Sequence, residues 1–131
     1  MEKLSASLED YLEIIYNGAN GEKYLRAVDI SKKLQISRAS VAEALRKLVS
    51  KGFINYDRHD SISLTEIGEN IAKKIVSKHT ILQRFFETTL ELTEEEASEN
   101  ACRIEHVITD NAFKKISEYI NKQDSKWSHS K

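Results

Sequence analysis

The only cysteine of the 131-residue chain, Cys102, is followed closely by Glu105 and His106, so three kinds of metal-binding side chain fall within five residues. At about 100° per residue, these three positions lie on one face of a helix, whereas Ala101 and Ile104 lie on another. Thiolate, carboxylate and imidazole groups are common ligands of transition metals. Glutamate and histidine also occur together by chance, so the spacing fits either a metal site or three unrelated side chains.

Three more side chains elsewhere in the chain are candidates to complete such a site. Asp10 and Glu13 are three residues apart in a predicted helix and therefore share a face, and His79 falls in a later predicted helix. Each has a simpler explanation: Asp10 as a carboxylate of a first helical turn, Glu13 as a solvated acid and His79 as a surface residue. Taken singly, the simpler explanations are favoured.

The composition narrows the class of protein. With 40% apolar residues, 31% charged residues and no proline, the chain is expected to be a globular, helix-rich protein. One cysteine cannot form an internal disulfide, and there is no signal peptide or bilayer-spanning apolar run, so we expect a cytoplasmic protein with no membrane partner. The net charge of -1 excludes a uniformly basic coat for nucleic acid.

The first half of the chain has the pattern of a helix-turn-helix with a wing. Ser7 as an N-cap and apolar periodicity predict a helix from about Ser7 to Asn17, and a short helix is predicted at 28–35. A third helix is predicted to begin at its cap Ser37 and to stop at Gly52, with a buried stripe of Val41, Ala44, Leu45 and Leu48. Residues 53–56 and 61–64 alternate like strands, and the polar residues between them favour a hairpin. These elements predict a winged helix over residues 1–65.

The second half is predicted to be all helical. A long linking helix covers residues 66–88, a short acidic helix follows Thr93, and one amphipathic helix runs from Ala101 to Asn121, with a frayed tail from Lys122. The expected fold class is therefore mainly α: an N-terminal winged helix-turn-helix with a small β-hairpin wing, then a helical domain at 89–131.

Basic residues concentrate in the winged-helix half. Residues 26–58 contain eight Lys and Arg against three acids, and such charge binds phosphates while a helix in the major groove reads base edges. Surface solvation explains any one of these residues, and winged helices also bind proteins, but the combination favours DNA. The predicted DNA-contacting residues are Arg26, Ser37, Arg38, Ser40, Glu43, Arg46, Lys47 and Arg58.

Three segments together resemble the metal-dependent repressors of the diphtheria toxin repressor family, including its manganese-sensing branch. They are residues 7–16 (SLEDYLEIIY), Lys78-His79 and residues 101–107 (ACRIEHV), and the last of them is highly specific. The resemblance covers nearly the whole chain and implies that 89–131 is a metal-binding and dimerisation domain, with a divalent metal as corepressor. It implies as metal ligands Asp10, Glu13, His79, Cys102, Glu105 and His106.

Two departures from the family pattern bear on the metal. Iron-sensing members have methionine in place of Asp10, whereas manganese sensors often have glutamate in place of Cys102, so this chain combines features of both. Carboxylate oxygens suit Mn²⁺, while a thiolate is softer and accepts Fe²⁺ readily. The resemblance favours Mn²⁺, with Fe²⁺ as the alternative.

Two further departures concern additional sites and domains. Gln83 and Ser98 occupy positions where iron-type members have ancillary metal ligands, which argues against a site of that type. The chain also ends near Lys131, before the SH3-like third domain of longer members.

The expected function is a repressor of metal homeostasis that binds a palindromic double-stranded operator as a homodimer when loaded with metal. Dimerisation would place two recognition helices roughly 34–36 Å apart in successive major grooves. Candidate dimer contacts, equally compatible with core packing, are Ile104, Ile108, Phe113 and Ile116. The alternatives are a metal-independent winged-helix transcription factor, a hydrolytic metalloenzyme, and a protein with a structural zinc ion.

Overall fold

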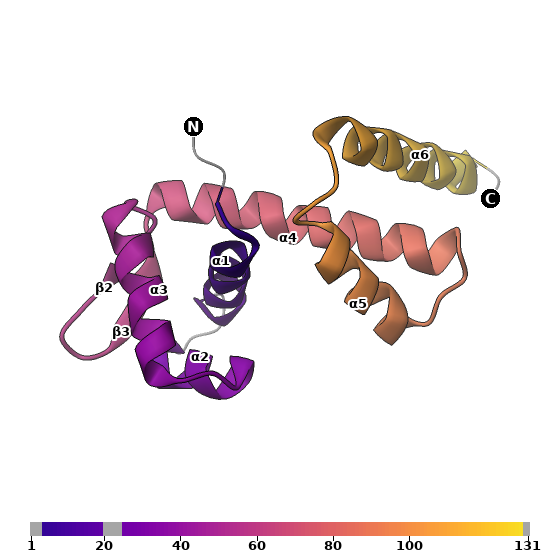
Figure 1. Cartoon of the computed structure of the whole chain (residues 1–131). Helices are drawn as coiled ribbons and strands as arrows, with labels where there is room; N and C mark the ends of the chain where they lie inside the picture. The colour runs from indigo at the N-terminus through magenta and orange to yellow at the C-terminus, as the bar shows by residue number, and fades with distance from the viewer. Residues whose placement is uncertain (1–3, 20–24, 130–131) are drawn as a thin grey trace. The chain divides into compact units, whose positions relative to one another are not determined.

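The structure, a computed structural model, describes residues 4–19 and 25–129 (Figure 1). Contacts divide the chain into two compact units, Met1–Lys74 and Ile75–Lys131, and each is described by itself. The described residues form mainly helices, with a small antiparallel sheet in the first unit, so the predicted fold class is confirmed. None of the described helices is long and apolar enough to cross a membrane.

Three helices of the first unit begin and end at local signals. Helix α1 (Ala6–Ala19) is capped by Ser5, whose Oγ accepts the Leu8 N–H at 3.2 Å, so the prediction that Ser7 is the cap was wrong by two residues. Helix α2 (Ala27–Leu34) ends at Gln35 in the left-handed region (φ 56°). Helix α3 (Arg38–Ser50) starts at the predicted cap, Ser37, whose Oγ accepts the Ser40 N–H at 3.1 Å.

The wing is a hairpin of β2 (Ile54–Tyr56) and β3 (Ser61–Leu64), as predicted. Asp57 shapes its turn, because one carboxylate oxygen accepts the N–H groups of His59 (2.8 Å) and Ser61 (3.1 Å). A third strand, β1 (Leu25–Arg26), pairs with β3 on the other side and gives the order β1-β3-β2. The sequence did not predict β1, since two residues carry no periodicity.

The core of the first unit lies between the helices and the inner face of the sheet. The predicted stripe of α3 (Val41, Ala44, Leu45 and Leu48) is buried, and so are Leu12, Ile15, Ile30, Ile54 and Ile62. Ile67, an apolar residue of the linking helix predicted at 66–88, is 60% exposed. Because the apolar stripe of α3 is buried, the opposite face of this helix is exposed to solvent.

Glycine has a defined role at Gly68, in the first turn of α4 (Glu66–Thr88). A Cβ on this residue would lie 1.8 Å from the backbone oxygen of Phe53, so only glycine lets the helix approach the start of the wing. The boundary between the units falls within α4, after Lys74.

The second unit contains the rest of α4 together with α5 (Glu94–Ile104) and α6 (Asp110–His129). Thr93 caps α5 as predicted, accepting the Glu96 N–H at 3.1 Å. The predicted single helix from Ala101 to Asn121 was wrong, because residues 105–109 form a turn between α5 and α6. The frayed tail from Lys122 was also wrong, because α6 continues to His129.

The break in the predicted helix has a local cause. Thr109 caps α6, its Oγ1 accepting the Ala112 N–H at 3.1 Å. The preceding residues Val107 and Ile108 are β-branched and lower the helix propensity of the turn. The core of this unit consists of Ile75, Leu82, Ala97, Ala101 and Ile120.

Candidate metal centre and nucleic-acid interface

Four of the six predicted metal ligands lie together in the second unit. Cys102 belongs to the last turn of α5, and Glu105 and His106 follow in the turn before α6. Donor atoms of these three side chains lie within 4.8 Å of one another. His79 reaches the same carboxylate from α4, with its Nδ1 atom 3.2 Å from Glu105 Oε2. Residues from two helices and one turn therefore converge on Glu105.

The closeness of the three sequential ligands does not depend on the helix that was predicted for them. Glu105 is the C-terminal cap of α5, with φ −54° and ψ −29°, and its N–H donates to Ala101 O at 2.9 Å. Because Glu105 keeps helical dihedral angles, it stays on the same side as Cys102. His106 follows in the turn, with its Nε2 atom 3.5 Å from Glu105 Oε1.

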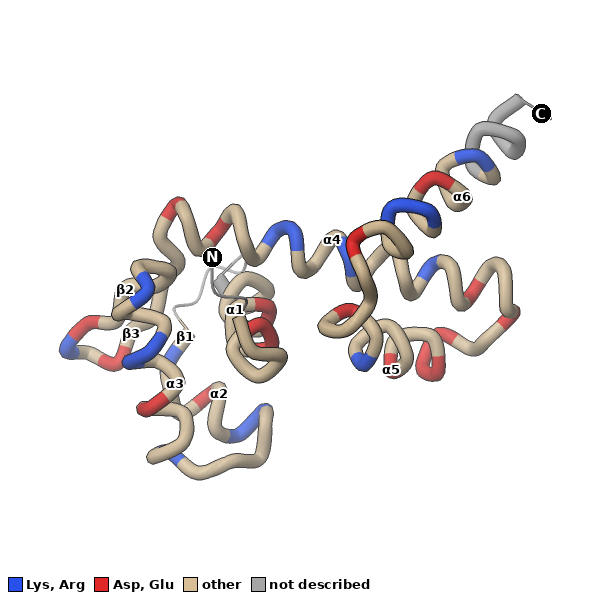
Figure 2. Tube along the Cα trace, turned by 45° about the horizontal axis from the view of Figure 1, so that its top comes forward, with Lys and Arg blue, Asp and Glu red and all other residues tan. Residues whose placement is uncertain are grey.

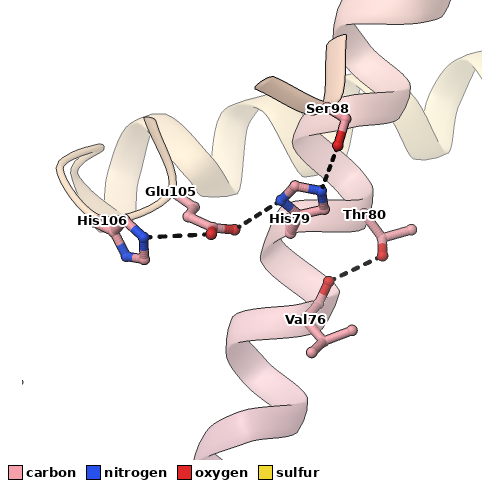
Figure 3. A network of polar contacts seen from close by, with 6 residues as sticks. All are labelled: Val76, His79, Thr80, Ser98, Glu105 and His106. Atoms are coloured by element: carbon pink, nitrogen blue, oxygen red, sulfur yellow. Dashed lines mark hydrogen bonds and ion pairs between the residues drawn. The ribbon is translucent and has the colours of Figure 1, made fainter. Parts of the chain in front are cut away.

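Glu105 is the central side chain of the cluster. The residue is only 2% exposed, and its two oxygens face two imidazoles: Oε2 faces His79, and Oε1 lies 3.5 Å from His106 Nε2 (Figure 3). Removing a carboxylate from water is costly unless positive charge or hydrogen-bond donors compensate. The burial of this carboxylate between two potential ligands is the feature expected of a site for a cation.

The donor set suits a divalent transition metal. Cys102 and His106 offer a thiol and an imidazole on one side of the Glu105 carboxylate, and His79 offers a second imidazole in a group that overlaps the first at Glu105. All of these donors bind such ions. These residues fit the corepressor metal that the sequence predicts, and the ion would supply the positive charge that the buried carboxylate requires.

Asp10 and Glu13 belong to the first unit, where both are half-buried on α1 and share one face of the helix. That unit is described separately from the one that holds the other four residues. Their membership of the metal site stays a prediction.

The predicted DNA-contacting residues lie on exposed parts of the first unit. On α3, Arg38, Ser40, Glu43, Arg46 and Lys47 are all exposed, opposite the buried stripe. Figure 2 shows the basic residues along α2, α3 and the hairpin. The remaining members are the cap Ser37, Arg26 in β1 and Arg58 in the turn of the wing, and each of them is exposed. This placement suits a helix that enters the major groove, while contact itself stays a prediction.

Local contacts order several of these side chains. Ser37 Oγ lies 3.0 Å from Ser40 Oγ, and Lys47 Nζ lies 3.7 Å from Glu43 Oε1. In the wing, Tyr56 donates to Asp60, and this hydrogen bond, together with partial burial, raises the pKa of Tyr56.

Ser98 is a residue of the centre that the sequence did not identify. The sequence marked it only as a departure from an ancillary ligand pattern, yet its Oγ lies 3.4 Å from His79 Nε2. The one available signal was its spacing of four residues before Cys102, which places both on one side of α5.

Two family profiles match almost the whole chain. "Iron dependent repressor, N-terminal DNA binding domain" matches residues 3–62, and "Iron dependent repressor, metal binding and dimerisation domain" matches residues 65–128. An uncharacterised HTH-type transcriptional regulator of Methanocaldococcus jannaschii is 35% identical over 120 residues, which cover 91% of this chain and 96% of that protein. The HTH-type transcriptional regulator MntR of Oceanobacillus iheyensis is 30% identical over 115 residues, which cover 88% of this chain and 78% of that protein.

Solved structures share the fold. A manganese-dependent transcriptional repressor in complex with manganese superposes with a TM-score of 0.80 at 23% identity, covering 87% of this chain and 52% of that one. The IdeR protein of T. acidophilum gives a TM-score of 0.78 at 25% identity, and the match covers 92% of this chain and 56% of that one. This chain thus spans about half the length of these two structures.

Proposed function

The chain belongs to the iron-dependent repressor family of metal-dependent transcriptional repressors, and from this premise we propose that it represses genes of metal homeostasis in response to Mn²⁺. In this proposal a homodimer in the cytoplasm binds a palindromic operator when loaded with metal. Membership of the family confirms the expected classes of partner, which are DNA, metal and a second copy of the chain, and it excludes the hydrolytic metalloenzyme.

The observation that carries the metal response is the buried carboxylate of Glu105. It lies between His79 and His106, in the same unit as Cys102, and all four side chains are metal-binding types. We assign them as ligands together with Asp10 and Glu13 of α1. These last two residues belong to the DNA-binding part of the chain, so an ion held by both sets would couple metal to DNA binding.

The coupling follows from charge. Without a cation, the carboxylates of Asp10, Glu13 and Glu105 would repel one another if they were brought together, which disfavours that arrangement. A bound ion removes the repulsion and selects the arrangement that fits DNA. A tenfold shift in DNA affinity requires only about 1.4 kcal/mol of differential metal affinity between the two states.

Manganese is supported by the hard carboxylate donors and by the relatives. One similar structure is named as manganese-dependent, another as a manganese regulator, and MntR proteins recur among the relatives. The thiol of Cys102 is a softer donor and makes Fe²⁺ the alternative. Similar solved structures are named with bound Zn²⁺ and with bound Cd²⁺, so the test compares ions directly.

The test is DNA binding with and without metal. A duplex selected from random sequences with the Mn²⁺-loaded protein serves as the operator, and fluorescence anisotropy measures affinity with Mn²⁺, with Fe²⁺ under anaerobic conditions, and with chelator. We expect tight binding with Mn²⁺ and its loss in chelator. Equal affinity in all conditions would contradict the metal response and would favour the metal-independent regulator instead.

A further inference from the structure

We propose that Ser98 is a positioning residue for the metal ligand His79, because its hydroxyl can bond to the imidazole ring in both of the tautomers that the site requires. This inference rests on the proposed function, in which His79 binds the ion. It gives a role to a serine that the family resemblance marks only as a missing ligand.

The ring of His79 is held from two sides. Nδ1 lies 3.2 Å from Glu105 Oε2, and Nε2 lies 3.4 Å from Ser98 Oγ (Figure 3). The His79 side chain is 18% exposed, and Ser98 is half-buried on α5. Since Nδ1 faces the carboxylate at the centre of the cluster, it is the nitrogen available to an ion there, and Ser98 contacts the other one.

The two states of the site need opposite tautomers. Without an ion, the carboxylate of Glu105 accepts the proton of Nδ1–H, and Nε2 accepts a hydrogen bond from the Ser98 hydroxyl. Binding an ion requires the lone pair of Nδ1, so the neutral ring carries its proton on Nε2 and donates it to Ser98 Oγ. The two states therefore differ in which ring nitrogen carries the proton.

A hydroxyl serves both states because it is both a donor and an acceptor. A lysine in its place could only donate and a carboxylate could only accept, so each would favour one tautomer. An alanine would leave the half-buried Nε2–H of the loaded state without its protein partner, which penalises metal binding.

The orientation of Ser98 is not the usual one for a hydroxyl on a helix. Such groups commonly bond back to the carbonyl four residues earlier, as Thr80 does on α4, where Oγ1 donates to Val76 O at 3.0 Å (Figure 3). Ser98 instead contacts a side chain 19 residues away in the sequence. Thr80 is therefore a matched control: it is next to His79 and has a hydroxyl, but that hydroxyl bonds to the backbone.

The first experiment measures Mn²⁺ affinity of the full chain by calorimetry. We expect Ser98→Ala to bind about tenfold more weakly than the wild type, as is typical when the second partner of a ligating histidine is lost. Ser98→Thr, which keeps the hydroxyl, and Thr80→Ala should bind close to the wild type. Thermal unfolding in chelator should be the same for the wild type and Ser98→Ala, since the contact supports the ligand rather than the fold.

The second experiment reads the tautomer. Nitrogen-15 NMR of the histidine rings should show the His79 proton on Nδ1 in the metal-free chain and on Nε2 after loading with Cd²⁺, a diamagnetic ion. A loaded ring with its proton still on Nδ1 would overturn the inference, as would equal Mn²⁺ affinity of the wild type and Ser98→Ala. A wild-type chain that binds no Mn²⁺ would overturn the proposed function, and this inference with it.

Discussion

At the scale of single residues, Glu105 determines what the second unit can bind. Its carboxylate is nearly inaccessible to water and has an imidazole on each side. Each oxygen faces a different histidine, so the carboxylate is placed to contact an ion on either side. Loss of the charge should affect metal binding far more than the fold.

We expect Glu105→Gln to lower Mn²⁺ affinity by more than about a hundredfold, beyond the usual effect of outer-sphere changes. The amide has the same shape and can still accept from His79, so the metal-free variant should unfold at the same or a higher temperature. Calorimetry and thermal unfolding in chelator measure the two effects. Unchanged Mn²⁺ affinity would remove Glu105 from the ligand set.

His106 can be tested against another histidine of the chain. We expect His106→Ala to lose at least about tenfold of the Mn²⁺ stimulation of operator binding, because an imidazole ligand is removed. His59→Ala, which changes an exposed histidine in the turn of the wing, should keep the response. Anisotropy titrations with Mn²⁺ and with chelator give the ratio of the two operator affinities for each variant. An equal ratio in His106→Ala and His59→Ala would contradict the assignment of His106 as a ligand.

The exposed cations of α3 give a separate prediction. Arg46→Ala should weaken DNA binding and reduce the slope of log affinity against log salt by about one, because one phosphate contact is lost. Lys115→Ala removes the same charge from α6, outside the predicted interface, and should leave the slope unchanged. Equal slopes for the two variants would place Arg46 outside the interface.

At the scale of helices and strands, caps and close approaches position these residues. Ser37 caps α3, the helix that carries most of the predicted DNA-contacting residues. Thr109 caps α6, which begins after the turn that contains Glu105 and His106. Gly68 lets the first turn of α4 pack against the backbone of Phe53. These are short-range features with large consequences for the placement of side chains.

Gly68→Ala should destabilise the chain by about 3 kcal/mol, since the new Cβ would overlap backbone atoms that have no room to move. Gly18→Ala is the control: its Cβ would lie 3.1 Å from the flexible end of the Leu25 side chain, and alanine in a helix gains about 0.5–1 kcal/mol over glycine. Urea denaturation of the metal-free chain compares the two. Similar stabilities would mean that α4 shifts to accept the methyl group.

At the scale of the whole molecule, each unit has an apolar core of its own. Because these cores do not need an ion, removal of metal should leave the helix content, measured by circular dichroism, unchanged. Operator binding, which the proposed function makes dependent on metal, should be abolished. A large loss of helix in chelator would instead indicate a structural ion, as in proteins that fold only with zinc. Adding Mn²⁺ back should restore binding without a refolding step.

Much of the first unit was predictable because its signals are local. The cap at Ser37, the stripe from Val41 to Leu48 and the turn at Asp57 each depend on neighbours within a few residues, and the structure confirms all three. The family resemblance likewise gave His79, Cys102, Glu105 and His106 as candidate metal ligands from short motifs. Side-chain types and local spacing thus determined the fold class and the residues to inspect.

Tertiary structure decided what local signals left open. Apolar periodicity did not reveal the break at residues 105–109, and the local cap at Thr109 that marks it was missed. Only tertiary structure places the Glu105 carboxylate, which is 2% exposed, between His79 and His106. Strand β1 exists only because β3 lies beside it. The contact between Ser98 and His79 joins two helices across 19 residues, and the spacing of Ser98 from Cys102 does not by itself predict it. Packing between elements, which has no period in the sequence, turned a set of metal-binding side chains into a candidate site.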